Sequence, residues 1–312
     1  MTRMLIVICL CIHAPFAARA QERRAAAPSF DQRDLQGIFF DSLDDAFRGE
    51  KPSLSKVRQS SNQSMIAASK TESNDAVEAE SGGSNGWNEL ISPAALEDAV
   101  KTTKLNFDSM ITTPGAFNSG GYLDARLDLS ILATLFAVIN EYSGDVRWKD
   151  QAAAARDLIS RTAFNCKAGS TQVYNEAKLR KADLQDLVSG SGLANRDANP
   201  ENDWAMIVDR TPLMQYAEKL SEQIRSASRD AKSTENNADA IRRDAQLLAM
   251  VGRVLTREGL DEADDEDYAA FSLSMTKAAT AVAVAIERGD YEIGPKVGAV
   301  TQSCDACHEM YR

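Results

Sequence analysis

Apolar residues recur along most of the chain at spacings of three and four, which is the period of an amphipathic α-helix. From Trp87 onward this period predicts helical segments separated by short stretches that contain glycine or proline. The first set of segments covers approximately 93–112, 122–142, 149–166 and 172–188. The second set covers approximately 202–228, 236–258, 265–287 and 294–312. We therefore expect an all-α protein.

The two sets resemble each other, with a near-constant offset of about 116 to 120 residues. Asp128–Ala133 is echoed by Asp244–Ala249. Both sets also open with a tryptophan followed by a hydroxyl residue and a proline, Ser92-Pro93 and Thr211-Pro212, which suits the N-cap and first position of a helix. Four helices with short connections favour an antiparallel bundle. The pattern predicts two tandem four-helix bundles, at 87–190 and 200–312.

The segment before these helices is not expected to belong to the helical bundles. Arg3 precedes an apolar run that ends near Phe16, and small residues around Ala20 suit cleavage, so residues 1–20 are expected to be a signal peptide. We expect a periplasmic mature chain with no stable membrane insertion, because no later stretch approaches membrane-spanning length. Residues 21–86 are rich in Ser, Asn, Glu and Gly and predict a poorly ordered segment and tether. Within it, Phe30–Phe47 is amphipathic, and either packs loosely on the main body or docks a partner.

The last nine residues hold the candidate chemistry, Cys304-Asp305-Ala306-Cys307-His308-Glu309-Met310-Tyr311-Arg312. Cys-x-x-Cys-His is the attachment signature of a c-type haem, in which each thiol bonds to one vinyl group and the histidine coordinates the iron. On a helix, Cys304, Cys307 and His308 project from one face. An apolar stripe through Val297 and Val300 continues that face. The motif predicts one covalently attached haem c per chain.

Three other uses of the cysteines have to be weighed against haem attachment. A structural zinc site needs four ligands, and the mature chain offers only His308 and Cys166 beyond the motif thiols, so carboxylates would be required. A redox-active Cys-x-x-Cys usually belongs to a βαβ pattern, whereas the segments here are helical. A structural disulfide remains open but gives His308 no role.

The first predicted bundle lacks the motif. An offset of 120 places Cys304, Cys307 and His308 on Leu184, Leu187 and Val188. No histidine lies between residues 87 and 200, so this bundle cannot bind haem in the same way, and we expect a structural or interaction role. Its Cys166 is predicted to be a buried apolar thiol, with an intermolecular disulfide as the alternative.

A haem motif at the C-terminus of a four-helix bundle resembles the cytochrome c′ family of class II c-type cytochromes. The resemblance covers about 202–312 and, more faintly, 87–188; the leader, the tether and the tandem arrangement are outside the family's usual pattern. It implies that His308 is the proximal iron ligand and that Cys304 and Cys307 are the attachment points. Arg312 matches a basic position beside the proximal imidazole, although a solvated arginine fits equally well.

In this family the first helix of the bundle supplies or blocks the opposite axial position. The resemblance makes Met214 the candidate sixth ligand, although methionine on an apolar helical face is usually core. Leu213 is the alternative, an apolar residue that leaves the iron five-coordinate. Arg210, one turn before Met214, is a candidate partner of a haem propionate. Met206 and Met250 are lesser candidates for ligation.

The net charge and the composition reduce the number of candidate functions. The formal charge of −11 becomes −13 once Arg3 and Arg19 leave with the signal peptide. An acidic chain argues against nucleic acid and favours a redox partner with a basic patch, although solubility alone explains the charge equally well. We expect a mono-haem electron carrier, or alternatively a protein that binds NO or CO at an open distal site. We expect no enzyme activity, because no second histidine supplies acid–base chemistry, and a homodimer is among the assemblies that the resemblance implies.

Overall fold

The structure is a computed structural model that describes residues 86–194 and 197–311. Within these ranges the regular elements are helices and there is no strand, so the all-α prediction is confirmed. The predicted signal peptide, the tether to residue 85, the amphipathic segment Phe30–Phe47 and Arg312 lie outside the described residues.

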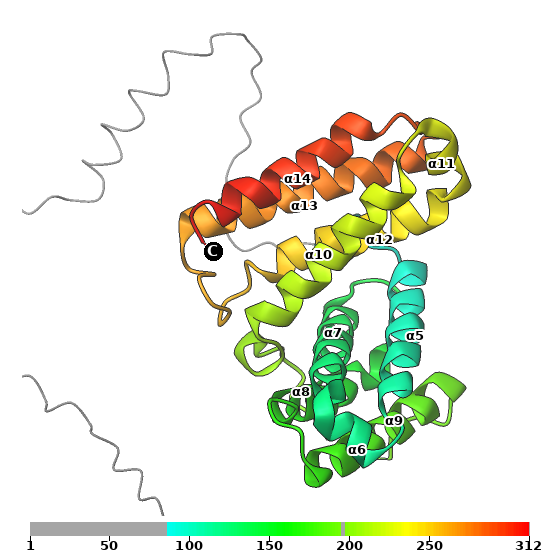
Figure 1. Ribbon diagram of the computed structural model, residues 1–312, viewed down its shortest axis with the longest axis vertical. Helices are drawn as coiled ribbons and strands as arrows, with labels where there is room; N and C mark the ends of the chain where they lie inside the picture. The colour runs from blue at the N-terminus through cyan, green and yellow to red at the C-terminus, as the bar shows by residue number, and fades with distance from the viewer. Residues whose placement is uncertain (1–85, 195–196, 312) are drawn as a thin grey trace, which may run out of the picture. The chain divides into compact units, whose positions relative to one another are not determined.

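Four long helices form what we call the first group: α5 (Pro93–Met110), α7 (Tyr122–Glu141), α8 (Ala152–Asn165) and α9 (Thr171–Ser189). α5 and α8 each pack against both α7 and α9 (Figure 1). Short elements connect them: α4 (Trp87–Leu90), α6 (Pro114–Ala116), η1 (Phe117–Gly121) and η2 (Lys149–Gln151). As predicted, α5 begins at Pro93, and the Ser92 hydroxyl caps it by accepting a 3.3 Å hydrogen bond from the backbone N–H of Ala95.

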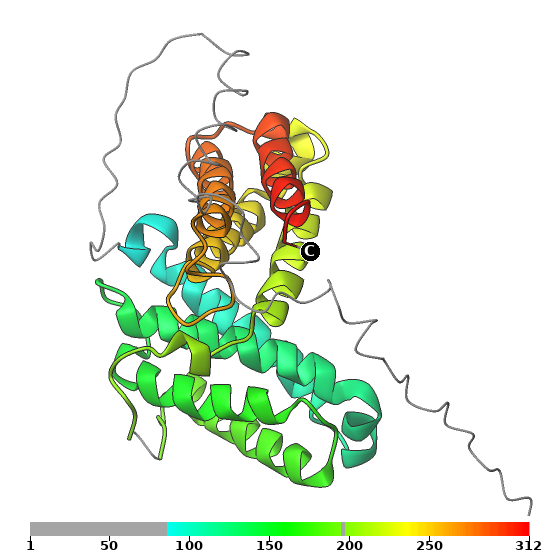
Figure 2. The same cartoon turned by 90° about the vertical axis from the view of Figure 1, so that its left-hand side faces the viewer.

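The second group consists of α10 (Arg210–Ala227), α12 (Ala238–Val254), α13 (Glu266–Glu287) and α14 (Gly294–His308). α10 and α13 each contact both α12 and α14, and α13 and α14 run side by side in both views (Figures 1 and 2). Two short elements complete the group: η3 (Trp204–Met206) before α10 and α11 (Ala231–Asn236) after it.

The start of α10 differs from the prediction. We expected this helix from about residue 202, with Thr211 as the N-cap, whereas the helix begins at Arg210 and Asp209 is its N-cap residue. Pro212 therefore lies inside the first turn, where its missing N–H costs nothing because the first N–H groups of a helix have no intrahelical partner. The preceding residues form the short η3 turn, held by the buried Trp204 side chain.

The length and composition of α13 (Glu266–Glu287) differ from what we expected. By length and composition alone, its 22 residues are apolar enough to cross a membrane, contrary to the prediction that no segment after the leader approaches that length. The helix packs between α12 and α14 and buries Met275, Ala279 and Val282. A core helix of a globular protein has the same length and composition, so this feature is weak evidence for a membrane span.

α12 and α13 approach each other closely at Gly252. A Cβ atom there would lie 2.4 Å from the Thr276 hydroxyl oxygen and 2.7 Å from the Ser272 carbonyl oxygen. The Thr276 hydroxyl donates a 3.2 Å hydrogen bond to the carbonyl of Ala249 on α12. Glycine is therefore required for the close contact that sets the position of α13.

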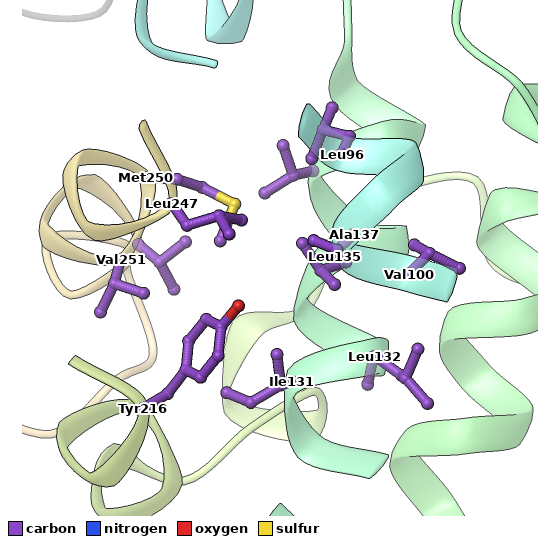
Figure 3. Close-up of a cluster of buried hydrophobic side chains, with 14 of the residues drawn as sticks. Leu96, Val100, Ile131, Leu132, Leu135, Ala137, Tyr216, Leu247, Met250 and Val251 are labelled. Carbon is purple, nitrogen blue, oxygen red and sulfur yellow. The ribbon is translucent and has the colours of Figure 1, made fainter. Parts of the chain in front are cut away.

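The two groups share one apolar core. Figure 3 shows Leu96 of α5 and Ile131 and Leu135 of α7 in the same buried cluster as Met250 of α12 and Tyr216 of α10. Burying a large apolar side chain stabilises a fold by roughly 1.5–3 kcal/mol. All described residues accordingly belong to a single compact unit.

Candidate functional site

The residues of the C-terminal motif line one cavity. It has a volume of about 540 Å³, and its walls are formed mainly by α10, α13 and α14. Cys304, Cys307 and His308 come from α14, and Met214 and Arg210 come from α10. The structure thus brings together, around one hollow, five of the described residues that the sequence selected.

α14 presents the motif as the spacing predicts. Val300 is buried, and Val297, Cys304 and Cys307 pack partly buried against the core, while His308 at the end of the helix is exposed. Both motif cysteines are free thiols, not joined in a disulfide. Burial raises the pKa of each thiol above its ordinary value, which disfavours the thiolate form that binds metal ions.

Tyr311 fixes the chain just beyond the motif. Its hydroxyl donates a 2.8 Å hydrogen bond to Asp265, and its ring packs edge-on against Tyr268 with 5.2 Å between the ring centres. Asp265 also caps α13 by accepting hydrogen bonds from the backbone N–H groups of Asp267 and Tyr268. Within the acidic run from 261 to 267, Asp265 is thus the residue whose side chain caps the helix.

α10 distinguishes between the methionine and leucine candidates. Met214 is partly buried and lines the cavity, whereas its neighbour Leu213 is fully buried in the core and is not a lining residue. Met250 is also fully buried in the core, and Met206 is 65% exposed beside a different hollow. Of the three methionines that the sequence selected, Met214 is the one that lines the cavity.

Arg210 lies at the same cavity, close to an aromatic ring and an acid. Its guanidinium carbon is 5.8 Å from the centre of the Tyr268 ring, and its Nη1 is 3.8 Å from a carboxylate oxygen of Glu262. The Glu262 side chain is roughly half exposed, so this ion pair is weak. The guanidinium remains available to pair with an anionic group of a ligand.

The sequence reasoning missed the contribution of α13. Tyr268, Phe271 and Met275 line the cavity from this helix, and Leu255 does so from the end of α12. Their spacing of three, four and seven residues is a helical stripe, which was a usable signal. The Ser272 hydroxyl is also buried at this wall and has no hydrogen-bond partner among the described residues. Met275 adds a second sulfur to the site.

The first group has almost no corresponding space. Leu184 and Leu187, which align with the two motif cysteines, are both buried. The hollow beside them measures only about 10 Å³, and Leu193 from the connecting segment helps to line it. Cys166 is completely buried, which raises its pKa to about 12, so the prediction of a buried thiol is confirmed.

The residues present fit a covalently attached haem. The cavity volume falls within the range of about 300–1,000 Å³ that is usual for cofactor sites. Aromatic and aliphatic side chains surround two thiols, an imidazole, a thioether and a guanidinium, which match the needs of a porphyrin, its iron and its carboxylates. Among the described residues, no group of three or more His, Cys, Asp or Glu side chains is placed to hold a metal ion on its own.

Comparison with protein-family models, with curated proteins and with solved structures gives no significant match to this chain. Function is therefore inferred from the residues of the site and their geometry.

Proposed function

We propose that this chain is an exported mono-haem cytochrome c, similar to the cytochrome c′ family, that transfers single electrons. The observation that carries the proposal is that Cys304, Cys307 and His308 line the same cavity as Met214 on the facing helix. A bound haem supplies reversible one-electron chemistry at its iron.

Each residue of the site has a role in this proposal. Cys304 and Cys307 would hold the porphyrin covalently, and His308 would ligate the iron from α14. Met214 would supply a second iron ligand from α10. Arg210 offsets the charge of a propionate. The apolar side chains from α13 and α12 exclude water, which tunes the potential.

We also propose that the two groups are tandem four-helix bundles derived from one unit. The cyclic packing of four helices in each group supports this, as does the alignment of Leu184 and Leu187 with the motif cysteines. Aliphatic side chains fill the first bundle where the second has a cavity. The first bundle is then a structural element that binds no haem.

The second candidate function is binding of NO or CO at the face of the iron next to α10. The observation that favours it is the Ser272 hydroxyl, which is buried at the cavity wall and has no hydrogen-bond partner within the described part of the chain. A six-coordinate iron favours electron transfer and a five-coordinate iron favours gas binding, so the spectrum of the ferrous protein separates the two.

The net charge of the chain indicates what kind of partner protein it would bind. With a formal charge of −13 after loss of the leader, the chain suits a periplasmic redox partner that carries a basic patch. The tandem bundle can replace the homodimer that members of the cytochrome c′ family often form. Sedimentation as a dimer through the second bundle would contradict that replacement.

The test is a pyridine haemochrome assay and an intact mass on the full chain, matured in a host that attaches haem c. We expect one haem per chain, retained after denaturation. The variant C304A/C307A should lose covalent haem, whereas the control C166A, which removes the buried thiol of the first group, should keep it. Colourless wild-type protein with no added mass would overturn the proposal.

A further inference from the structure

α10 has two different faces: one packs against other helices, and the other lines the cavity. Leu213, Tyr216, Leu220 and Ile224 are buried, and the helix packs against α12 of its own group and α7 of the first group. Figure 3 shows Tyr216 in the cluster that also contains Ile131 of α7. The other face, with Met214, lines the cavity. α10 is therefore a wall between the cavity and the first group.

The start of α10 is tied to the first group by charge. The Asp209 carboxylate pairs with the guanidinium of Arg126 on α7 and, at 3.3 Å, with the ammonium of Lys167, which follows α8. The side chains of Arg126 and Asp209 are only 22% and 34% exposed, so this pair is partly shielded from water. Ion pairs of this kind are screened less than fully exposed ones.

The Asp209 side chain forms ion pairs with the first group and does not cap its own helix. An aspartate at the N-cap position usually accepts a hydrogen bond from a backbone N–H in the first turn. Asp209 makes no such bond, whereas Ser92, the N-cap residue of α5, caps that helix with its own hydroxyl. The first turn of α10 thus depends on contacts with another part of the protein.

Met214 lies five residues after Asp209, which is about 7.5 Å along the helix axis. A displacement of the anchored end therefore moves Met214 and Arg210 together, because both lie within the first turns of the same rigid helix. The first group can in this way act on the cavity without lining it.

We infer that the first group regulates the axial face of the site by holding the start of α10, with Arg126 and Lys167 as positioning residues. This inference rests on the proposed function. While the ion pairs are made, Met214 stays at the cavity wall and would block access of a small ligand from the side of α10. When they break, the first turn of α10 moves and a diatomic ligand gains access.

The test compares full-length, haem-loaded proteins. The variant R126Q/K167Q removes both cations that face Asp209. The matched control R161Q/K178Q removes an exposed arginine from α8 and an exposed lysine from α9 of the same group, so its net charge is identical. Two properties are measured: hydrogen–deuterium exchange of the backbone amides in residues 211–216, and the rate constant for CO association with the ferrous protein.

We expect R126Q/K167Q to exchange faster over residues 211–216 and to bind CO about two- to fivefold faster than the wild type, in keeping with the strength of partly exposed ion pairs. The control should match the wild type, and R126K, which keeps the charge, should remain close to it. The single variant R126Q should give an intermediate increase, and it covers the case in which the double variant does not fold.

The outcomes separate this inference from the proposed function. If R126Q/K167Q and R126Q behave like the control while all carry haem, the inference is wrong and the proposed function stands. If the wild type carries no haem, the proposed function fails, and the exchange measurement alone decides whether the first group holds α10.

Discussion

The hydroxyl of Tyr311 donates a 2.8 Å hydrogen bond to Asp265, so the chain just beyond the motif closes onto the residue that caps α13. This contact joins the end of α14 to the start of the helix beside it. It fixes the position of His308, three residues earlier, relative to the aromatic wall of the cavity.

Replacing Tyr311 by Phe should lower the melting temperature by a few degrees, because it removes this hydrogen bond and leaves the ring contacts. The bond to Asp265 raises the pKa of Tyr311 to about 12, from an ordinary value of 10. Its stabilisation is therefore complete below pH 10 and is lost as the pH rises from 10 towards 12. Thermal melts at pH 8 and pH 11 measure this, and the difference between wild type and Y311F should shrink at the higher pH. The variant Y291F, at a partly buried tyrosine, is the control.

Met214 and Met275 provide a matched pair at the cavity, one on each of two walls. If Met214 ligates the iron, M214L should convert a low-spin ferrous spectrum to a high-spin one and lower the reduction potential, because the thioether ligand is lost. M275L should leave both unchanged. The opposite result, with M275L alone changing the spin state, would assign the ligand to α13.

Asp128 on α7 should make stability depend on pH. Burial raises its pKa to about 7; Lys219 opposes the shift and Asp124 adds to it. Since the folded pKa exceeds the ordinary value of 3.8, ionisation costs stability as the pH rises from about 4 to 7, and the full cost remains above 7. D128N should therefore be more stable than the wild type at pH 8, by at most about 4 kcal/mol.

Urea unfolding at pH 4.5, 6 and 8 measures this effect. The advantage of D128N should shrink steadily towards the lowest pH, whereas the control D98N, at an exposed position on α5, should show no such trend. A constant difference between D128N and the wild type would show that Asp128 does not titrate in this range.

Arg257 should hold the junction between the groups. Its guanidinium carbon lies 4.9 Å from the ring centre of Trp87 and 5.8 Å from that of Trp204, and it pairs at 2.7 Å with Glu141 of α7. R257M should cost about 1–3 kcal/mol, because Glu141 loses its cation while the indole of Trp87 still donates to it.

Tryptophan fluorescence during urea unfolding reports this loss directly, since two of the three tryptophans lie at the junction. The native emission should change in R257M as the cation leaves both rings. R161M, at an exposed arginine on α8, is the control and should leave both emission and stability close to the wild type. Unchanged unfolding of R257M would mean that the apolar core alone holds the groups together.

The helices themselves could be read from the sequence because helical spacing is a local property. The predicted ranges for α5, α7, α13 and α14 agree with the structure to within a few residues. The start of α10 could not be read, because Asp209 is held by Arg126 and Lys167, which lie far away in the sequence. Tertiary contacts override local capping signals in such cases.

The site could be predicted only in part, for a similar reason. The motif identified Cys304, Cys307 and His308, because their roles depend on spacing within one helix. The choice between Leu213 and Met214 depends on the rotation of α10, which packing against α7 and α12 sets. Met275 was missed because the sequence does not say which stripe of α13 faces the cavity.

The contrast between a filled first group and a hollow second group also bears on how such a chain matures. The helices of the first group pack against one another, and under the proposed export they leave the channel before the helices of the second group. In the proposed cytochrome, the first group would offer α10 an apolar surface to dock on before haem is attached to α14. Under the proposed function, one half of the molecule serves as a template that keeps the other half assembled until the thiols are linked.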